Sequence, residues 1–575
     1  MHRPRGALLA LLLLTSRSTS LQPRPPVHPA KATTSTMAAT STHECPSVAD
    51  PHVLDIILAS AVPGFLSYTV PSERVVQANA EGMRVLARFS STAPEKLEGG
   101  GRGGGSTRVT LPADYDEDGI GTAELFVKRV SAPSYSHKSW TDLRRTLVYL
   151  RTEARFYHEI VPLLVSSSEV KGESRLAEHL PEVYGTSCDL SGLIPEDHPT
   201  TDAKHPCPYD EGDDRARDDA LRGRGGHIVL QSLGSGRYFQ DSPVSLEGSR
   251  QCLVAAARLH ASAWGDREVL ARVADRLSDA GGSYQLRFRN PKELENMVSS
   301  WEHFLTQFGS GGGRATEVLG RESVRELGRR VYEMAKYVSD KLSPAVDDEY
   351  ATIVHGDYKS MNVFLPTNSD EPAIMIDFSC AGVGYGMSDL GMHIVHANLP
   401  SELDDGGEES LIESYLTALE SMMSARTGRE WVYPRKVAMR HYRLACVDYL
   451  RFIMGRFWRS ATPESFEKKN QVHCRPLFLQ SVIQPENVVV DVILTRARAH
   501  KMEELAEVQR VVPPDLYGAR DEDHDGIAAR RRLDVRRLHL VLHSPDLFEL
   551  LDYVCRALEL VPLKRHHGLI ILFPS

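Results

Sequence analysis

Several features are missing from this 575-residue sequence, and each absence excludes a class of protein. There is no basic surplus, because 67 Lys and Arg residues stand against 77 Asp and Glu, a formal net charge of −10. A general nucleic-acid binder needs excess cations to neutralise phosphates, so we predict no nucleic-acid partner. No stretch beyond the N-terminal segment is apolar enough to cross a bilayer, so we predict no integral membrane segment.

The sequence also lacks a cysteine framework. No CxxC pair and no zinc-ligand spacing occurs, and a chain of this length does not need disulfides to stabilise its core. We therefore expect free, mostly buried thiols. The cysteines are Cys45, Cys188, Cys207, Cys252, Cys380, Cys446, Cys474 and Cys555.

Two apparent motifs lack the residues that would make them functional. The run Gly99–Gly105 holds six glycines and one arginine, which cannot fix a phosphate-binding turn, so we expect a flexible hairpin tip. Asp114–Gly119 and Asp521–Gly526 begin like calcium-binding loops. However, Leu125 and Arg532 stand where such a loop needs a bidentate Glu. We interpret both as surface Asp-Gly turns.

The first 43 residues contain no Asp or Glu and have the layout of a targeting segment. A basic start precedes the apolar run Ala7–Leu14, and Ser18 and Ser20 supply the small residues of a signal cleavage site. The following Leu21–His43 is basic and rich in Ser and Thr, as transit peptides are. We predict that segment 1–43 directs the chain into the secretory pathway, with a plastid as the destination if both parts act. A chain whose signal is not used would remain cytoplasmic.

Hydrophobic periodicity divides the remaining chain into a strand-rich part and a helical part. Alternating apolar residues predict strands between 75 and 130, and an apolar stripe at spacings of three and four predicts a helix over 140–165. The pattern is helical over 249–342 and again over 388–509, with short apolar strands over 352–377 between them.

These patterns predict an α+β protein with a small, β-rich N-terminal lobe and a larger helical C-terminal lobe. We place the N-terminal lobe at 44–226, with a Gly-rich and an acidic inserted loop, the latter within 188–226. The catalytic C-terminal lobe follows at 227–510. An extension at 511–575 has no assigned role.

One segment carries chemistry. An apolar strand delivers His355 and Asp357 into a loop, Asn362 follows five residues later at the start of a second strand, and a third apolar strand ends at Asp377. We expect these side chains to converge at the ends of adjacent strands. Phosphoryl transfer needs a carboxylate that accepts the proton of the attacking hydroxyl and oxygen ligands that bind Mg²⁺ on the ATP phosphates.

The motifs HGDYKSMN and IDFSCAGVGYGMSDL resemble the catalytic and metal-binding segments of the aminoglycoside phosphotransferase and choline kinase superfamily. They are most similar to its CHK-kinase-like branch, which includes the ecdysteroid-kinase-like proteins. The resemblance implies a protein-kinase-like fold and an ATP- and Mg²⁺-dependent kinase of a small-molecule hydroxyl. It assigns Asp357 as catalytic base, with Asn362 and Asp377 as Mg²⁺ ligands. Lys359 occupies the place of a lysine that meets the γ-phosphate and acceptor, and a solvated loop residue is the alternative.

The same resemblance assigns supporting roles. Asp389 and His355 would organise the catalytic loop, and the LHASAW segment (Leu259–Trp264) would pack beneath it. Lys128, the one lysine of an apolar strand, fits the cation that binds the α- and β-phosphates. Glu153 of an ExxFY motif fits its partner, because an uncompensated carboxylate beside the apolar stripe would be costly. A surface helix glutamate is the alternative.

Adenine is expected to bind a strand that connects the lobes, over His227–Ser232, around Gln231 and Leu233. The family often has an acidic pair there, whereas this chain has Gln-Ser.

Other functions remain open. A catalytically silent nucleotide-binding pseudokinase or scaffold is the main alternative, but such proteins usually lose the base, the metal Asp or the lysine, and none is lost here. A protein-serine kinase is disfavoured, because the loop lacks the Arg of HRD and no APE-like segment follows Asp377. The sequence does not select the acceptor.

Aromatic residues in the second helical stretch could cage a cationic acceptor, although at helical spacing we favour the protein core. They are Tyr415, Trp431, Tyr433, Tyr442, Tyr449 and Trp458.

Overall fold

The structure of the protein is a computed structural model. It describes residues 51–62, 64–70, 75–76, 80–90, 116, 119–167, 176–196, 206–234, 236–289, 291–309, 319–466, 565–566 and 569–570. The predicted targeting segment, the glycine run and the second calcium-like stretch lie outside these residues and stay predictions. In the C-terminal extension, only β12 (Arg565–His566) and β13 (Leu569–Ile570) are described, and they pair with each other.

The N-terminal lobe contains a six-stranded antiparallel sheet. Its strands are β1 (Phe65–Thr69), β2 (Val75–Val76), β3 (Glu81–Ser90), β4 (Ile120–Ser131), β5 (Val183–Asp189) and β6 (Gly225–Gln231). The order is β1-β3-β4-β6-β5, with β2 paired to β3. Since β6 lies between β4 and β5, the sheet continues past the lobe boundary predicted between residues 226 and 227.

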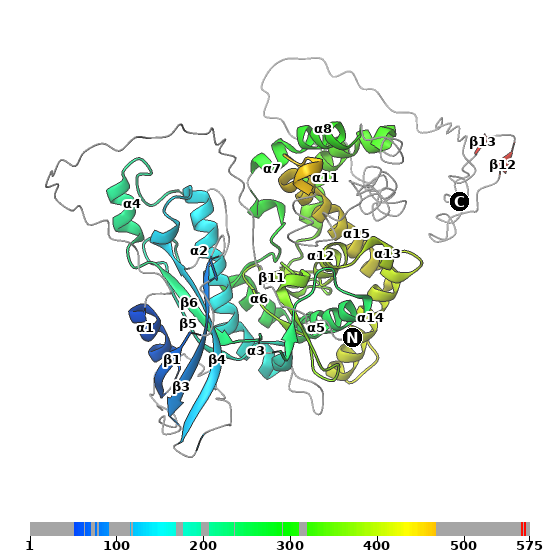
Figure 1. The fold of residues 1–575 in the computed structure, drawn as a ribbon. Helices are drawn as coiled ribbons and strands as arrows, with labels where there is room; N and C mark the ends of the chain where they lie inside the picture. The colour runs from blue at the N-terminus through cyan, green and yellow to red at the C-terminus, as the bar shows by residue number, and fades with distance from the viewer. Residues whose placement is uncertain are drawn as a thin grey trace, which may run out of the picture.

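The two faces of this sheet meet different helices because side chains alternate along each strand. Val85 of β3 and Val127 of β4 are fully buried against α1 (Pro51–Ala61). Lys128, next to Val127, therefore points to the opposite face, where α2 (Trp140–Arg155) contacts β6 and β5. Figure 1 shows α2 on the side of the sheet nearer the C-terminal lobe.

The helix predicted over 140–165 is confirmed. Ser139 caps α2 by accepting a hydrogen bond from Asp142 N, and one π-helical turn (Phe156–Ile160) connects α2 to α3 (Val161–Ser167). The π turn begins at Phe156, so it contains the Phe and Tyr of the ExxFY motif, and Glu153 lies in the last turn of α2. Such turns often occur at functional sites.

The acidic insert within 188–226 is more ordered than the predicted surface loop. It contains α4 (Asp214–Leu221), which begins where the Asp213 carboxylate caps two backbone N–H groups and ends on the fully buried Leu221. Polar composition concealed this helix, because its single fully buried apolar side chain gives no periodicity. Of the first calcium-like stretch, Asp116 and Gly119 are described. Gly119 N donates to Asp116 O at 2.9 Å, as in the predicted turn, and Asp116 Oδ1 accepts from Ile120 N at 2.8 Å.

The C-terminal lobe is helical (Figure 1). Its helices are α5 (Leu246–Ala263), α6 (Arg267–Arg276), α7 (Pro291–Glu295), α8 (Met297–Phe308), α10 (Glu322–Arg325), α11 (Leu327–Lys341), α12 (Met387–Ala397), α13 (Pro400–Leu403), α14 (Gly407–Thr427) and α15 (Arg435–Phe452), the last continued by a π turn (Ile453–Phe457). Residues 277–289 interrupt the helical pattern predicted over 249–342 with a loop that includes one 3₁₀ turn (Leu286–Phe288). The adjacent Gly281 and Gly282 account for this break.

The C-terminal lobe also contains short strands. They are β7 (Tyr238–Phe239), β8 (Thr352–Val354), β9 (Val363–Pro366), β10 (Ile374–Met375) and β11 (Gly382–Gly384). The expectation that the three strands of the catalytic segment are neighbours is half right. β10 pairs with β9, but β8 pairs with β11 in a separate ladder, because the chain returns along β8 after Asp377.

The predicted α+β fold with two lobes is confirmed. Of the six candidate cage aromatics, five are fully buried in the core, and Trp431 packs edge-on against Trp264 with ring centroids 5.3 Å apart. In the described part of the chain, no helix is both long and apolar enough to cross a membrane. The five cysteines within that part are free thiols.

Candidate active site

A buried network around Asp389 fixes the catalytic loop between β8 and β9. The Asp389 carboxylate accepts from the backbone N–H groups of His355 at 2.7 Å and Gly356 at 2.9 Å, and lies 3.1 Å from His260 Nε2. His355 in turn places Nε2 2.9 Å from Ile376 O, which joins the loop to the strand before Asp377. The LHASAW segment thus contacts the loop through His260, as the family resemblance implies.

Gly356 is required by geometry. Its φ is +79°, and a Cβ at this position would lie 2.1 Å from the carbonyl oxygen of Cys380. A side chain is therefore excluded twice, by backbone conformation and by space. This close approach brings the loop that carries Asp357 against the loop that follows Asp377.

Asp357 receives hydrogen bonds on both carboxylate oxygens. Lys359 Nζ lies 2.7 Å from Oδ2, and Asn362 Nδ2 donates to the same oxygen at 3.2 Å and to the Asp357 carbonyl at 2.8 Å. Ser283 Oγ donates to Oδ1 at 3.0 Å. Lys359 is therefore paired within the site, which disfavours the alternative of a solvated loop residue.

The N-terminal lobe contains the predicted Lys128–Glu153 ion pair. Lys128 Nζ lies 2.6 Å from Glu153 Oε2 and also 3.0 Å from Asp377 Oδ1 across the lobe boundary. Asp377 has a φ of +64°, unusual for a residue other than glycine, which turns its carboxylate out of the strand direction. The sequence predicted the first of these contacts and did not predict the second.

The two carboxylates that contact Lys128 have different pKa values because of burial and neighbouring charges. Burial raises the pKa of Glu153 to about 7 in spite of Lys128 beside it. Burial would raise the pKa of Asp377 as well, but Lys128 and Lys359 together lower it to about 2. Burial alone would lower the pKa of Lys128, yet Asp377 and Glu153 raise it above its ordinary value. Asp377 is therefore the carboxylate that stays ionised in this cluster.

The ExxFY and IDF motifs meet in a ring stack. Phe156 stacks on Phe378 with centroids 3.8 Å apart, and Tyr157 contacts the same ring edge-on at 5.8 Å. Phe378 also contacts His355 at 4.5 Å. The residues next to Glu153 and Asp377 thus form one apolar unit that connects α2 to the catalytic loop.

Asn362 and Asp377 are suitably placed for a magnesium ion. The Ile376 N–H donates to the Asn362 carbonyl at 2.9 Å, which brings the two candidate ligands to neighbouring positions. Asn362 uses its amide nitrogen toward Asp357, so its amide oxygen remains available as a ligand. Carboxylate and amide oxygens are the hard donors that Mg²⁺ takes together with substrate phosphates. The residues present therefore fit the ion.

The two predicted adenine-binding positions differ in the structure. The Gln231 N–H donates to Glu182 O at 2.8 Å within the sheet region, so it is not free for a ligand. Leu233 lies two residues further, in a small apolar cluster with Tyr238 and Ile374. Within the described residues its N–H has no hydrogen-bond partner, so Leu233 suits a purine edge better than Gln231 does.

Sequence reasoning missed several residues of the cleft. Arg84 lies against the connecting segment, where a Cβ on Gly234 would lie 2.3 Å from its Nη1. The ring of Phe126 lies over Gly82 of β3, where a Cβ would lie 2.6 Å from the ring, so only glycine leaves room for it. Because side chains alternate along a strand, Phe126 lies on the same face of β4 as Lys128 and could have been predicted. No pattern in the sequence indicates Arg84.

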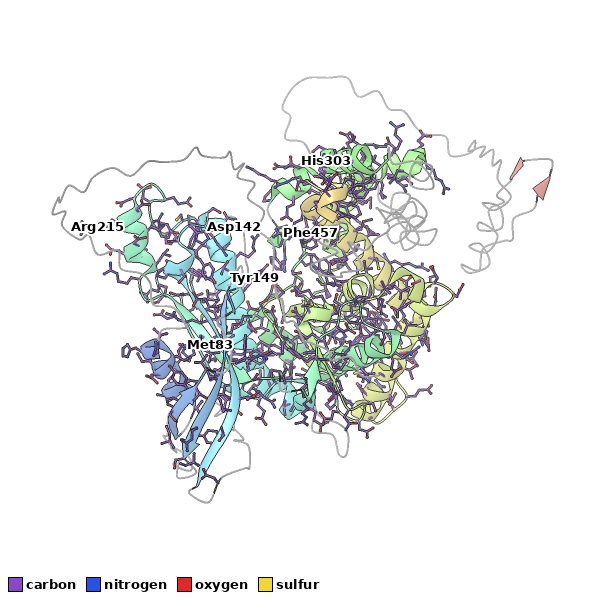
Figure 2. All side chains as sticks on the ribbon, in the orientation of Figure 1. Met83, Asp142, Tyr149, Arg215, His303 and Phe457 are labelled. Atoms are coloured by element: carbon purple, nitrogen blue, oxygen red, sulfur yellow. The ribbon has the colours of Figure 1, made fainter. Side chains whose placement is uncertain are left out.

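Ser283 was also missed. It lies in a stretch predicted as helix, and the only signal was the glycine pair before it. A narrow cleft beside it is lined by Tyr149 and Thr152 of α2, by Gly282 and Phe288, and by Cys380. Tyr149, labelled in Figure 2, lies between the two lobes, and burial raises the pKa of its hydroxyl.

Residues 312–428 match the family model described as the phosphotransferase enzyme family, abbreviated APH. The match shows that this segment is similar to that family. It includes the catalytic loop and Asp377 and omits the N-terminal lobe. No curated protein matches the chain.

The solved structures that are similar to this chain include two phosphotransferases and a choline kinase. An aminoglycoside phosphotransferase from Alicyclobacillus acidocaldarius is 12% identical, with 82% of this chain and 98% of that chain covered and a TM-score of 0.32. The choline kinase LicA from Streptococcus pneumoniae is 10% identical, with coverage of 79% and 98% and a TM-score of 0.30. The macrolide 2′-phosphotransferase MphH from Brachybacterium faecium is 13% identical, with coverage of 76% and 98% and a TM-score of 0.31. These values do not select an acceptor.

Proposed function

We propose that the protein is an ATP- and Mg²⁺-dependent kinase that transfers the γ-phosphate to a hydroxyl of a small-molecule acceptor. The observation that carries the proposal is the meeting of two charge clusters, one from each lobe. Asp357 with Lys359 lies on the C-terminal side, and Lys128 with Glu153 lies on the N-terminal side, joined through Asp377. Phosphoryl transfer depends on such positioning of charges more than on covalent chemistry.

Each residue has a task in this reaction. Asp357 orients the acceptor hydroxyl and accepts its proton as the oxygen attacks phosphorus. Lys359, paired with Asp357 at 2.7 Å, keeps a cation beside the transferred group. Lys128 binds the α- and β-phosphates, and Glu153 orients it. When bound between Asn362 and Asp377, Mg²⁺ neutralises the negative charge of the phosphate oxygens.

A catalytically silent nucleotide-binding scaffold is the alternative function. The retained base, lysine and metal ligands support the enzyme instead, because a scaffold needs none of them in this arrangement. We further propose the CHK-kinase-like branch, supported by HGDYKSMN and the ExxFY and HASAW motifs. The targeting role of residues 1–43 is likewise a proposal, supported by their acid-free composition.

An ADP-coupled screen of hydroxyl-bearing metabolites tests the proposal, with the full-length protein and with Asp357→Asn. We expect one acceptor class to give turnover that Asp357→Asn lowers by about 10²- to 10⁴-fold, since the general base is lost. Thermal stabilisation by Mg²⁺-ATP should persist in the variant. Nucleotide stabilisation without transfer to any acceptor would favour the scaffold.

A further inference from the structure

The 278–289 loop is an additional partner of the catalytic loop. Ser283 N donates to Gly356 O at 2.7 Å, beside the catalytic base. Gly282 N donates to Cys380 O at 3.1 Å, and Gly281 N to Val383 O at 2.7 Å, both after Asp377. The loop is therefore bonded by its backbone to both segments that carry the catalytic carboxylates.

The glycine pair permits this close approach. A Cβ on Gly281 would lie 2.4 Å from Val354 Cγ2 and 3.0 Å from Gly382 N, so a side chain there would push the loop off β8 and β11. Gly282 has a φ of +137°, which residues with a side chain rarely adopt. Two consecutive glycines thus bring Ser283 to the catalytic base.

The backbone of Ser283 is fixed on both sides. Its N–H is bonded to the catalytic loop, and its carbonyl accepts from Arg289 Nη1 at 3.2 Å. Arg289 is itself buried and forms two hydrogen bonds to Glu293, at 2.8 Å and 2.7 Å. The next residue is fixed too, since the Tyr284 hydroxyl donates to Ser388 O at 2.9 Å. The serine hydroxyl therefore has a defined position.

This hydroxyl contacts one oxygen of Asp357, while Lys359 and Asn362 contact the other. The two carboxylate oxygens are thus restrained from opposite sides, which fixes the rotation of the carboxylate. A carboxylate oxygen has a second acceptor site, so Oδ1 can still receive an acceptor hydroxyl.

We propose that Ser283 is a positioning residue that holds Asp357 in the orientation needed to accept the proton. The proposal rests on the proposed kinase function. A hydrogen bond to a charged group contributes about 1.5–3 kcal/mol, so its loss should lower kcat by roughly 10- to 100-fold. The KM for ATP should not change, because no nucleotide-binding residue is altered.

Three variants test this role with the acceptor found in the screen. Ser283→Ala should lower kcat by about 10- to 100-fold with an unchanged KM for ATP. Ser283→Thr keeps the hydroxyl and should restore most of the rate. Ser278→Ala is the matched control, since among the described residues the side chain of this buried serine in the same loop bonds only to the backbone of Ala280 and has no hydrogen bond with Asp357. It should keep the wild-type kcat.

Crystal structures of the wild type and Ser283→Ala give a readout that is independent of turnover. The Asp357 carboxylate should be rotated or present in several orientations in Ser283→Ala. An unchanged Asp357 would overturn the proposal, as would equal losses of kcat in Ser283→Ala and Ser278→Ala. If the wild type transfers phosphate to no acceptor, the kinase function fails by itself, and the orientation of Asp357 still decides the role of Ser283.

Discussion

The two walls of the site, one from each lobe, are stabilised in different ways. On the C-terminal side, Asp357 belongs to a loop fixed by the buried Asp389, which accepts two backbone hydrogen bonds and contacts His260. On the N-terminal side, Lys128 is positioned by two carboxylates, one of them in the other lobe. The side chain of Asp389 is 2% exposed, whereas that of Asp377 is 32% exposed.

This difference has a consequence for the site. Backbone hydrogen bonds to a buried carboxylate keep their geometry wherever the lobe is folded, and removing the carboxylate leaves buried N–H groups unpaired. A shared lysine between two lobes depends instead on how the lobes are placed and on which carboxylate is ionised. The proposed base is therefore preorganised, while Lys128, the proposed phosphate-binding lysine, depends on pH and lobe position.

The largest effect is expected at the contact that joins the two walls. Asp377→Ala should lower transfer at least about 100-fold, because it removes a metal ligand and one of the two partners of Lys128. The fold should be retained, since Asp377 is partly exposed. Initial rates over a range of Mg²⁺ concentrations measure the effect. Asp370→Ala, an exposed aspartate in the turn between β9 and β10, is the control and should behave as wild type.

Asp389→Ala should be the most destabilising change on the C-terminal wall. It leaves the His355 and Gly356 N–H groups buried without an acceptor, so we expect a loss of about 3 kcal/mol or more in the free energy of unfolding. Asp389→Asn keeps one oxygen acceptor, so its free energy of unfolding should lie between those of the wild type and Asp389→Ala. Urea unfolding measures both. Wild-type stability for Asp389→Ala would show that the loop does not depend on this carboxylate.

On the N-terminal wall, Glu153 should make the stability of the protein depend on pH. The pKa of Glu153 is raised from 4.5 to about 7 in the folded protein, so the folded state binds this proton more tightly than the unfolded state. The contribution of this group to stability is therefore fully present below about pH 4.5 and lost as pH rises through about 7. Glu153→Gln cannot titrate. The stability difference between wild type and Glu153→Gln should change over this pH interval, and a constant difference would contradict the prediction.

The smallest effect is expected where the acidic insert meets α2. Glu211 Oε1 accepts from Trp140 N at 3.0 Å, and Tyr209 packs edge-on against Trp140 with centroids 5.7 Å apart. Glu211→Ala should lower the free energy of unfolding by about 1 kcal/mol, as the loss of a helix cap does. Asp219→Ala removes a surface contact of the same insert with Arg222 and should change stability less. Equal effects would show that the insert does not stabilise α2.

Much of the site followed from the sequence because its residues are close along the chain. Asp357, Asn362 and Asp377 lie within one loop and two short strands, so the pattern of that short segment was enough to predict that they belong to one site. Lys128 and Glu153 could be paired because each lay on a strongly periodic element, a strand and a helix, whose inward face the pattern identifies. Their functional roles are what the proposed experiments test.

Tertiary structure alone decided the rest. Ser283 and Asp357 are 74 positions apart in the sequence, Lys128 and Asp377 are 249 apart, and no periodicity connects residues so far apart. Two other features could not be predicted from the sequence, the pairing of β8 with β11 and the helix in the acidic insert. Packing between distant segments determines which strands pair and where a helix docks. Sequence by itself determined the α+β elements and the catalytic motif, since both depend on local spacing. The three-dimensional fold decided which charges share a lysine and which serine fixes the base.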